Sequence, residues 1–173
     1  MKDRERTEIL HLLTEGADAL RASVAGIGES EASRTPGNGQ WSVLDCLEHV
    51  AVTERALFAG VRKATLADTP QYNPERETKI RNRALDRTRF IAAPEVVAPS
   101  GSVQTVGGAL AQFEIARAET IRFVEEFEGD PRAWLTTHPL VRSPVNCWEM
   151  LLMIALHPKR HAEQIVHIRE RTD

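Results

Sequence analysis

Apolar residues recur about every 3.6 residues in four segments of the chain, and this period predicts four amphipathic α-helices. The predicted helices span about residues 3–28, 42–66, 105–129 and 146–168. Ser42 is the expected N-cap of the second helix, because Asp45 follows three residues later as in a capping box. Asn146 and Glu149 form the equivalent pair at the start of the fourth helix. No segment shows a convincing period of two, so no β-strand is expected.

A long connection separates the second and third predicted helices. Residues 67–104 are too many for a simple turn between neighbouring helices. We expect a short helix around Pro74 to Thr88, followed by an extended piece from Ala92 to Pro99. The pattern therefore predicts an all-α fold, a four-helix bundle with one long crossover between helices 2 and 3. At 173 residues, the chain is expected to form a single domain spanning residues 1–173.

Pro158 falls inside the fourth predicted helix. Proline lacks the backbone donor and crowds the carbonyl four residues earlier, so we expect a kink or a local widening. The helix is expected to continue, because the apolar period resumes in register after Pro158, and water in a polar pocket would satisfy the freed carbonyl near Ile154. The alternative is that the helix breaks at the proline.

Composition and charge narrow the classes of function. The net charge of −3 gives no electrostatic footprint for nucleic acid or for an anionic membrane. The apolar stretches are much shorter than the roughly 20 residues that span a bilayer, and the charged N-terminus lacks the apolar run of a secretory signal. Cys46 and Cys147 both lie in predicted helices, so no disulfide framework is expected. A cytoplasmic location fits these features best.

The fourth predicted helix carries a histidine pair with metal-ligand spacing. His157 and His161 are four residues apart, and such positions lie on one face of a helix. His49, at the edge of the apolar face of the second helix, is a candidate third ligand. Three imidazoles on two helices would form an open His₃ site with positions left for water or substrate. The alternative is that His49 is solvated and that the pair is held in the core by other hydrogen bonds.

Other polar residues are weaker candidates. Gln164 follows His161 by one turn and is either an outer residue of the site or a core glutamine. Glu54 is either a fourth ligand or general base, or an ion-pair partner of Arg117. Cys46 is expected to be a small core residue rather than a thiol ligand. Three further histidines are expected to lie outside the site, namely His11, His138 and His167.

Three motifs together resemble the DinB-like superfamily of metal-binding four-helix bundles. They are Trp41-Ser42 leading to His49 in the pattern W-S-x-x-E-x-L-x-H, the Ala-Pro-Glu-Val-Val-Ala-Pro segment of the crossover, and His157-x-x-x-His161-x-x-Gln164-Ile165. The resemblance implies an up-down-down-up bundle in which His49, His157 and His161 bind a divalent ion such as zinc or nickel. Two residues depart from the pattern: Asp45 replaces the usual glutamate, and Pro158 separates the two histidines of the fourth helix.

The resemblance also implies candidate reactions. Superfamily members include thiol-S-transferases and isomerases that use low-molecular-weight thiols such as bacillithiol or mycothiol. The leading hypothesis is therefore a metal-dependent thiol-S-transferase acting on a small-molecule substrate. The alternatives are a metal-dependent hydrolase on the same triad, or a non-catalytic dimerisation module with a vestigial site. The resemblance further implies a homodimer.

Overall fold

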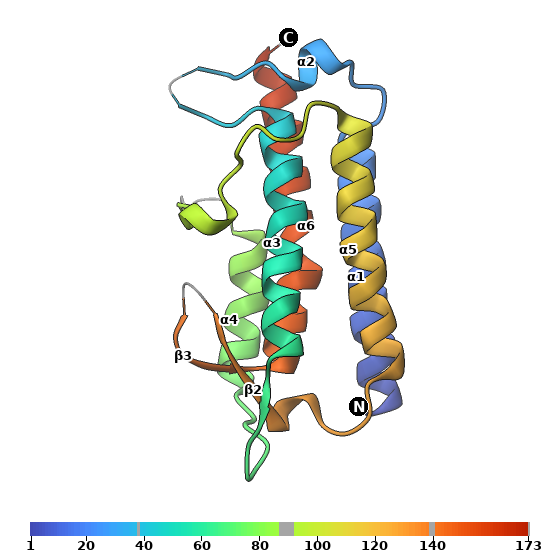
Figure 1. Cartoon of the computed structure of the whole chain (residues 1–173), viewed down its shortest axis with the longest axis vertical. Coiled ribbons are helices and arrows are strands. Elements are labelled where there is room, and N and C mark those ends of the chain that lie inside the picture. Colours follow the sequence, from blue (N-terminus) through green and yellow to red (C-terminus); the bar gives the residue numbers. More distant parts are fainter. Residues whose placement is uncertain (38, 87–91, 139–140, 173) are drawn as a thin grey trace.

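Four long helices form the body of the protein. The computed structural model describes residues 1–37, 39–86, 92–138 and 141–172. The long helices are α1 (Asp3–Ser23), α3 (Val43–Arg62), α5 (Val106–Glu126) and α6 (Cys147–Thr172). Helix α1 packs against α5 and α6, and α3 packs against the same two helices, while the termini lie at opposite ends of the bundle (Figure 1). The prediction of a helical bundle is confirmed.

The two predicted N-caps are present. Ser42 Oγ accepts a hydrogen bond from Asp45 N at 3.1 Å, and Asp45 Oδ2 accepts one from Ser42 N at 2.8 Å. At the start of α6, Asn146 Oδ1 accepts from Glu149 N at 2.9 Å, and Glu149 Oε2 accepts from Asn146 N at 3.0 Å. Each pair satisfies donors that a helix start leaves free, and so fixes where α3 and α6 begin.

Helix ends and the expected absence of strands were predicted wrongly: α5 ends at Glu126 rather than near residue 129, and α6 continues to Thr172, beyond residue 168. Helix α1 ends at Ser23, and a single-turn helix, α2 (Glu29–Ala32), follows it. Helix α3 ends at Arg62, and Leu66 belongs to a strand. A three-stranded antiparallel sheet pairs β2 with both β1 and β3, the strands being β1 (Thr65–Leu66), β2 (Trp134–His138) and β3 (Val141–Asn146). The strands are short, and β1 joins a partner far along the chain, so local periodicity carries little sign of them.

The crossover contains more structure than an extended chain. Helix α4 (Pro74–Leu85) packs against α6 and begins where Asn73 Oδ1 accepts from Arg76 N at 2.9 Å. It confirms the expected short helix, whose predicted end at Thr88 lies outside the described residues. The piece expected to be extended contains a 3₁₀ turn, η1 (Glu95–Val97), which contacts α3. Prolines at both sides of this segment leave room for only one turn.

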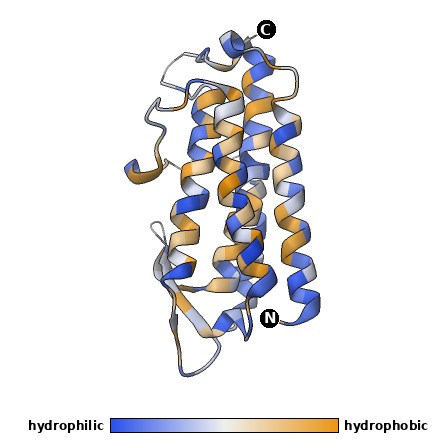
Figure 2. Cartoon of the chain, turned by 45° about the vertical axis from the view of Figure 1, so that its right-hand side comes forward, coloured by the Kyte–Doolittle hydropathy of each residue, from blue (hydrophilic) through white to orange (hydrophobic). Residues whose placement is uncertain are grey.

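A polar layer separates two apolar clusters in the core. One cluster includes Val50 and Phe113, and the other includes Leu57 and Val124. Between the two clusters along α3, α5 and α6 lie buried or partly buried polar side chains: Thr53, Glu54, Arg117, Thr120, His157 and His161. His49 joins this layer through its Nδ1, which lies 3.3 Å from Thr53 Oγ1. Apolar and polar positions alternate along the helices in Figure 2. Such a layer is costly unless its members pair with one another or with a ligand, so it marks where function is expected.

Helix α6 continues through Pro158, as predicted. The carbonyl of Ile154 accepts a hydrogen bond from Arg117 Nη2 at 3.3 Å, a partner that the sequence did not predict. Gly16 of α1 faces the same part of α6, and a Cβ added there would lie 2.5 Å from the carbonyl oxygen of Ala155. The stretch of α6 around Pro158 is therefore enclosed by α1 and α5.

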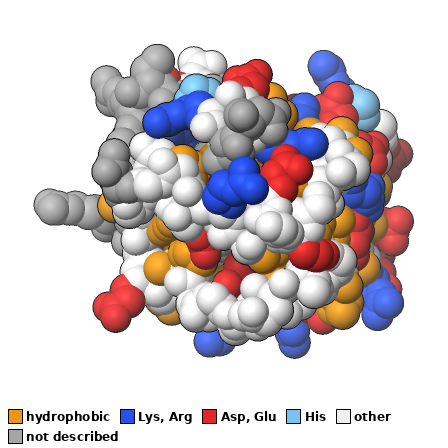
Figure 3. All heavy atoms as spheres, turned by 90° about the horizontal axis from the view of Figure 1, so that it is seen from above, with side chains coloured by type: hydrophobic (Ala, Val, Ile, Leu, Met, Phe, Trp, Pro, Cys, Tyr) orange, Lys and Arg blue, Asp and Glu red, His pale blue; other side chains and the backbone are white. Residues whose placement is uncertain are grey.

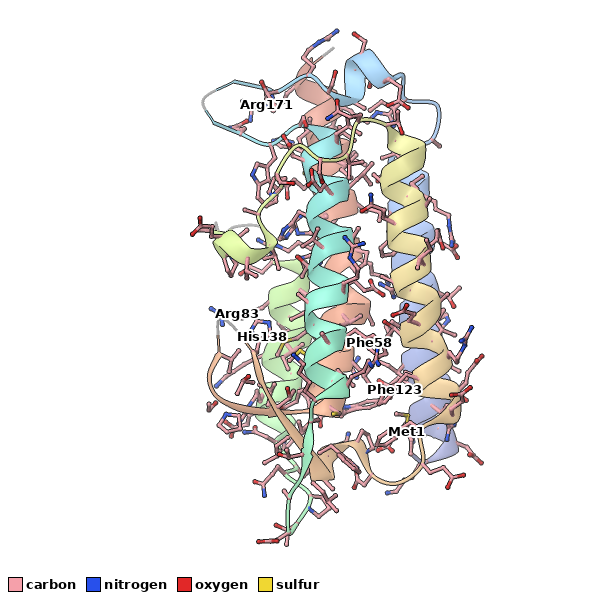
Figure 4. All side chains as sticks on the ribbon, in the orientation of Figure 1. Met1, Phe58, Arg83, Phe123, His138 and Arg171 are labelled. Carbon is pink, nitrogen blue, oxygen red and sulfur yellow. The ribbon has the colours of Figure 1, made fainter. Side chains whose placement is uncertain are left out.

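The apolar cluster that includes Leu57 and Val124 also contains Phe58 and Cys147, with Phe123 packed against it. Phe58 of α3 and Phe123 of α5 point toward each other in Figure 4, with ring centroids 5.6 Å apart. Cys147 is buried at the start of α6, and burial raises the pKa of its thiol to about 12, so it is protonated at neutral pH. Cys46 and Cys147 are not joined by a disulfide, as expected.

The surface carries charges of both signs. Basic and acidic side chains are interspersed on the end of the molecule seen in Figure 3. Across residues 1–37, 39–86, 92–138 and 141–172, no helix has both the length and the apolar character needed to cross a membrane.

Candidate metal centre

The three predicted ligands meet in the polar layer of the bundle. Helix α3 supplies His49, and α6 supplies His157 and His161. One ring nitrogen from each histidine lies within 4.8 Å of the others. Nε2 of His157 is 3.0 Å from Nε2 of His161, and the centroid of the His49 ring is 5.0 and 4.8 Å from theirs. The i, i+4 spacing thus gives convergent rings in spite of Pro158.

The backbone of the crossover fixes the protonation of His49. Nδ1 of His49 lies 2.7 Å from the carbonyl oxygen of Val97, and a carbonyl only accepts hydrogen bonds, so this nitrogen carries the proton. Thr53 Oγ1 lies 3.3 Å from the same nitrogen. The lone pair of the neutral ring is then on Nε2, the nitrogen suited to bind a metal.

Burial favours the neutral form of His49 and His157. It lowers the pKa of His49, although the hydrogen bond to Val97 opposes that shift. Burial also places the pKa of His157 well below the usual histidine value, and the positive charges of protonated His161 and His49 would lower it further. Neutral imidazole is the form that binds metal ions, so the site is ready for a ligand at neutral pH.

Trp41 covers one side of the triad. Its ring centroid lies 4.7 Å from that of His49 and 6.3 Å from that of His161, with the second pair stacked. This tryptophan stands just before the N-cap of α3, so the capped start of that helix also places the indole ring. An aromatic wall lowers the local polarity around the rings and strengthens electrostatic interactions there.

Glu54 is not a fourth ligand in this structure. Its Oε2 accepts from Arg117 Nη2 at 2.7 Å, and its Oε1 accepts from Thr120 Oγ1 at 3.3 Å. Burial raises the pKa of Glu54, whereas the charge and hydrogen bond of Arg117 oppose that rise. The alternative prediction, an ion-pair partner of Arg117, is confirmed.

The remaining histidine and cysteine candidates do not belong to the converging triad. His11 and His167 are exposed, beside Glu15 and Glu170 respectively. His138 is on β2 and is labelled in Figure 4 at the sheet end of the molecule. Cys46 is buried in the apolar cluster that includes Val50 and Phe113, as expected for a small core residue. Gln164 is partly buried one turn beyond His161, and its role remains a prediction.

Sequence reasoning missed two groups that hold the site. The carbonyl of Val97 has no sequence signature, because any residue offers one. Glu48 stands next to His49 and is 2 % exposed, yet it binds the crossover rather than a metal. At 100° per residue Glu48 lies well outside the stripe formed by Leu47, Val50 and Leu57, so the local pattern carries no signal for its burial.

A cavity of about 270 Å³ lies elsewhere, between the segment before α4, the β2–β3 strands and the start of α6. Arg76 and Glu149 line it, and none of its lining residues belongs to the triad. The convergence of titratable groups locates the candidate site better than cavity size does here.

The donor set of the triad fits a divalent ion. Three neutral imidazoles are typical of zinc, nickel, copper or iron sites. In a tetrahedral zinc site with bonds of about 2.0–2.1 Å, neighbouring ligand nitrogens are about 3.3 Å apart. The 3.0 Å between Nε2 of His157 and Nε2 of His161 needs only a small adjustment to reach that separation. Three protein ligands also leave a coordination position open.

Comparisons with known proteins agree with this architecture. The family model described as the DinB superfamily matches residues 12–165. Among solved structures, YfiT from Bacillus subtilis is similar, with a TM-score of 0.63 and 14% sequence identity over 99% of this chain and 89% of that one. That protein is described as "a probable metal-dependent hydrolase with an unusual four-helix bundle topology". A search of curated protein sequences finds no match. Because the family model spans most of its length, the chain belongs to the DinB superfamily.

Proposed function

We propose that His49, His157 and His161 bind one divalent ion, zinc or nickel, and that the protein is a metal-dependent enzyme. The observation that carries this proposal is the convergence of three imidazoles to within 4.8 Å in the buried polar layer. Three neutral imidazoles that converge in this way are a donor set that a divalent ion can bind.

The protein's own groups prepare the site. Val97 and Thr53 hold the proton of His49 on Nδ1, and burial keeps His157 unprotonated. Trp41 shields one side of the rings. When bound, a divalent ion would lower the pKa of a thiol or water at its open position.

We propose thiol-S-transfer, with a low-molecular-weight thiol as co-substrate, as the reaction. Two buried carboxylates close to His49 in sequence are already engaged, Glu48 with the crossover and Glu54 with Arg117. A thiol has a pKa of about 8.5 and ionises at a metal without help from a protein base. Water has a far higher pKa and gains more from a nearby carboxylate base.

Hydrolysis on the same triad is the second candidate. The observation that favours it is the fold of YfiT, which is described as a probable metal-dependent hydrolase. A His₃ site is compatible with activation of water, since carbonic anhydrase uses three histidines for that purpose. Likeness of fold is weak support for a particular reaction.

Metal binding is tested with protein prepared without chelators or an affinity tag. We expect about one divalent ion per chain by elemental analysis, and we expect His161→Ala to lose it. His167→Ala is the matched control, because His167 is exposed on the same helix and should retain the ion. A wild-type protein that carries no ion and binds neither added zinc nor added nickel would contradict the proposal.

The reaction is tested with a panel of bacillithiol, mycothiol and glutathione and a model electrophile. Thiol transfer predicts turnover that depends on both the metal and one of these thiols. Metal-dependent cleavage of model esters or amides without a thiol would favour hydrolysis. No metal-dependent turnover of either kind would favour the non-catalytic dimerisation module.

We also propose that the long helices follow the up-down-down-up order and that the protein is a cytoplasmic homodimer. The direct contact between α3 and α5 supports the order, because parallel neighbours need a long returning connection such as this crossover. The homodimer rests on the family resemblance, and light scattering on the purified protein measures it directly.

A further inference from the structure

Glu48 fastens the crossover to α3. Its Oε1 accepts hydrogen bonds from Ser100 N at 3.1 Å, Ser100 Oγ at 2.6 Å and Ser102 Oγ at 2.8 Å. Its Oε2 accepts from Gly101 N at 3.1 Å. Two backbone and two hydroxyl donors from three consecutive residues thus surround one buried carboxylate. This arrangement is specific for a charged acceptor with two oxygens.

The fastened segment also reaches the metal centre. Val97, at the end of η1, is three residues before Ser100, and its carbonyl accepts the proton of His49 Nδ1 at 2.7 Å. Val97 is itself buried, so the turn is packed against the bundle. Figure 1 shows the crossover, in yellow-green, running beside α3 before it enters α5. The neighbouring residues Glu48 and His49 therefore bind the crossover on either side of Ala98. His49 binds the carbonyl of Val97, and Glu48 binds residues 100–102.

We propose that Glu48 is a positioning residue for the metal centre, which acts through the crossover by holding the Val97 carbonyl against Nδ1 of His49. The inference rests on the proposed metal site. Glu48 is not a ligand, because both its oxygens are occupied by the donors of residues 100–102. Its effect on the ion is indirect, since the crossover fixes the tautomer and the orientation of one ligand.

Metal binding should in turn affect the crossover. An ion bound to Nε2 of His49 makes the Nδ1 proton a stronger donor to Val97, because coordination withdraws charge from the ring. Metal binding should therefore tighten the crossover, and a tightened crossover should favour metal binding to the same extent. The amides of Ser100 and Gly101, which donate to Glu48, report on this coupling.

The test is Glu48→Gln in the full-length protein, compared with Glu29→Gln. Glutamine keeps the size of the side chain but replaces one acceptor oxygen by a donor, so some of the four hydrogen bonds are lost. Glu29 is the matched control: its carboxylate accepts from Val106 N at 2.9 and 3.2 Å, at the far end of the crossover, without a link to His49. The measurements are the zinc Kd by competition titration and the His49 tautomer by ¹⁵N NMR of the metal-free protein.

We expect Glu48→Gln to weaken zinc binding about tenfold or more, the usual effect of losing an outer partner of a ligand. The fixed Nδ1–H tautomer of His49 should be lost in the same variant, and amides 100–102 should exchange faster even with zinc bound. Glu29→Gln should retain the wild-type Kd and tautomer. If Glu48→Gln does not fold, Ser102→Ala, which removes one donor, should weaken zinc binding in the same direction by a smaller factor.

Two results would overturn the proposal. One is an unchanged zinc Kd and an unchanged His49 tautomer in a folded Glu48→Gln or Ser102→Ala protein. The other is an equal loss of affinity in Glu29→Gln, which would show a general loosening of the crossover rather than a link through His49. A wild-type protein that binds no metal would instead contradict the metal-site proposal. In that case the His49 tautomer of the metal-free protein still tests the role of Glu48.

Discussion

At the scale of single residues, Arg117 joins three helices to α5 inside the polar layer. Its guanidinium donates to Leu13 O of α1 at 2.9 Å, to Glu54 Oε2 of α3 at 2.7 Å and to Ile154 O of α6 at 3.3 Å. The last acceptor is the carbonyl that Pro158 leaves without its helical donor. Arg117 thus donates a hydrogen bond that replaces the backbone donor missing at Pro158, close to the position of His157 on α6.

We predict that Arg117→Met lowers the free energy of unfolding by about 3–5 kcal/mol, because it leaves Glu54 buried without its partner. Urea denaturation measures this loss. Arg62→Met, at an exposed position, should change stability by less than about 0.5 kcal/mol. Adding Glu54→Met to Arg117→Met should recover part of the loss, since no charge is then left unpaired. A loss below about 1 kcal/mol for Arg117→Met would contradict this view of the pair.

At the scale of elements, the sequence predicts the helices well and the connections poorly. Caps such as Ser42 and Asn146 act within one turn, so local pattern reveals where α3 and α6 begin. The pairing of β1 with β2 joins Thr65 to Leu135, which no local period reports. The convergence of the histidine triad was predictable because helical spacing and motif order locate His49 and the α6 pair. The Val97 carbonyl was not predictable, because it depends on how the crossover folds.

The packing of α1 on α6 gives a second prediction. Gly16 has no side chain, and a Cβ there would lie 2.5 Å from the Ala155 carbonyl oxygen. Gly16→Ala should therefore destabilise the protein by about 1–3 kcal/mol through overpacking, despite the better helix propensity of alanine. Gly107→Ala, in α5, meets no atom within 4 Å and should be neutral or stabilise by up to about 1 kcal/mol. Thermal unfolding of both variants gives the comparison, and a stabilising Gly16→Ala would show that the helices can separate without cost.

At the scale of the whole molecule, the polar layer couples the bundle to its crossover. The two apolar clusters stabilise the ends of the bundle, while the layer between them holds the triad and the Glu54–Arg117 pair. The crossover closes over the layer through Val97 and Glu48. The site is therefore built from the helices of the bundle and from the crossover attached to them, and the crossover contacts His49 through the carbonyl of Val97.

This arrangement predicts a dependence of stability on acid pH. Burial raises the pKa of Glu48, but hydrogen bonds from Ser100 and Ser102 outweigh burial and lower it from 4.5 to about 2. The ionised carboxylate thus stabilises the fold above pH 4.5, and that contribution should be lost as the pH falls through about 2. Unfolding free energies of wild type and Glu48→Gln should converge across this window. A difference in unfolding free energy between the two proteins that stays constant with pH would contradict the lowered pKa of Glu48.

The central claim is that the triad binds a divalent ion, and anomalous diffraction from crystals of zinc-loaded protein tests it most directly. The account predicts one strong zinc peak within about 2.0–2.1 Å of Nε2 of His49, His157 and His161, with an open coordination position. An anomalous map with no peak at the triad, or with zinc bound only at surface histidines such as His11 and His167, would contradict it.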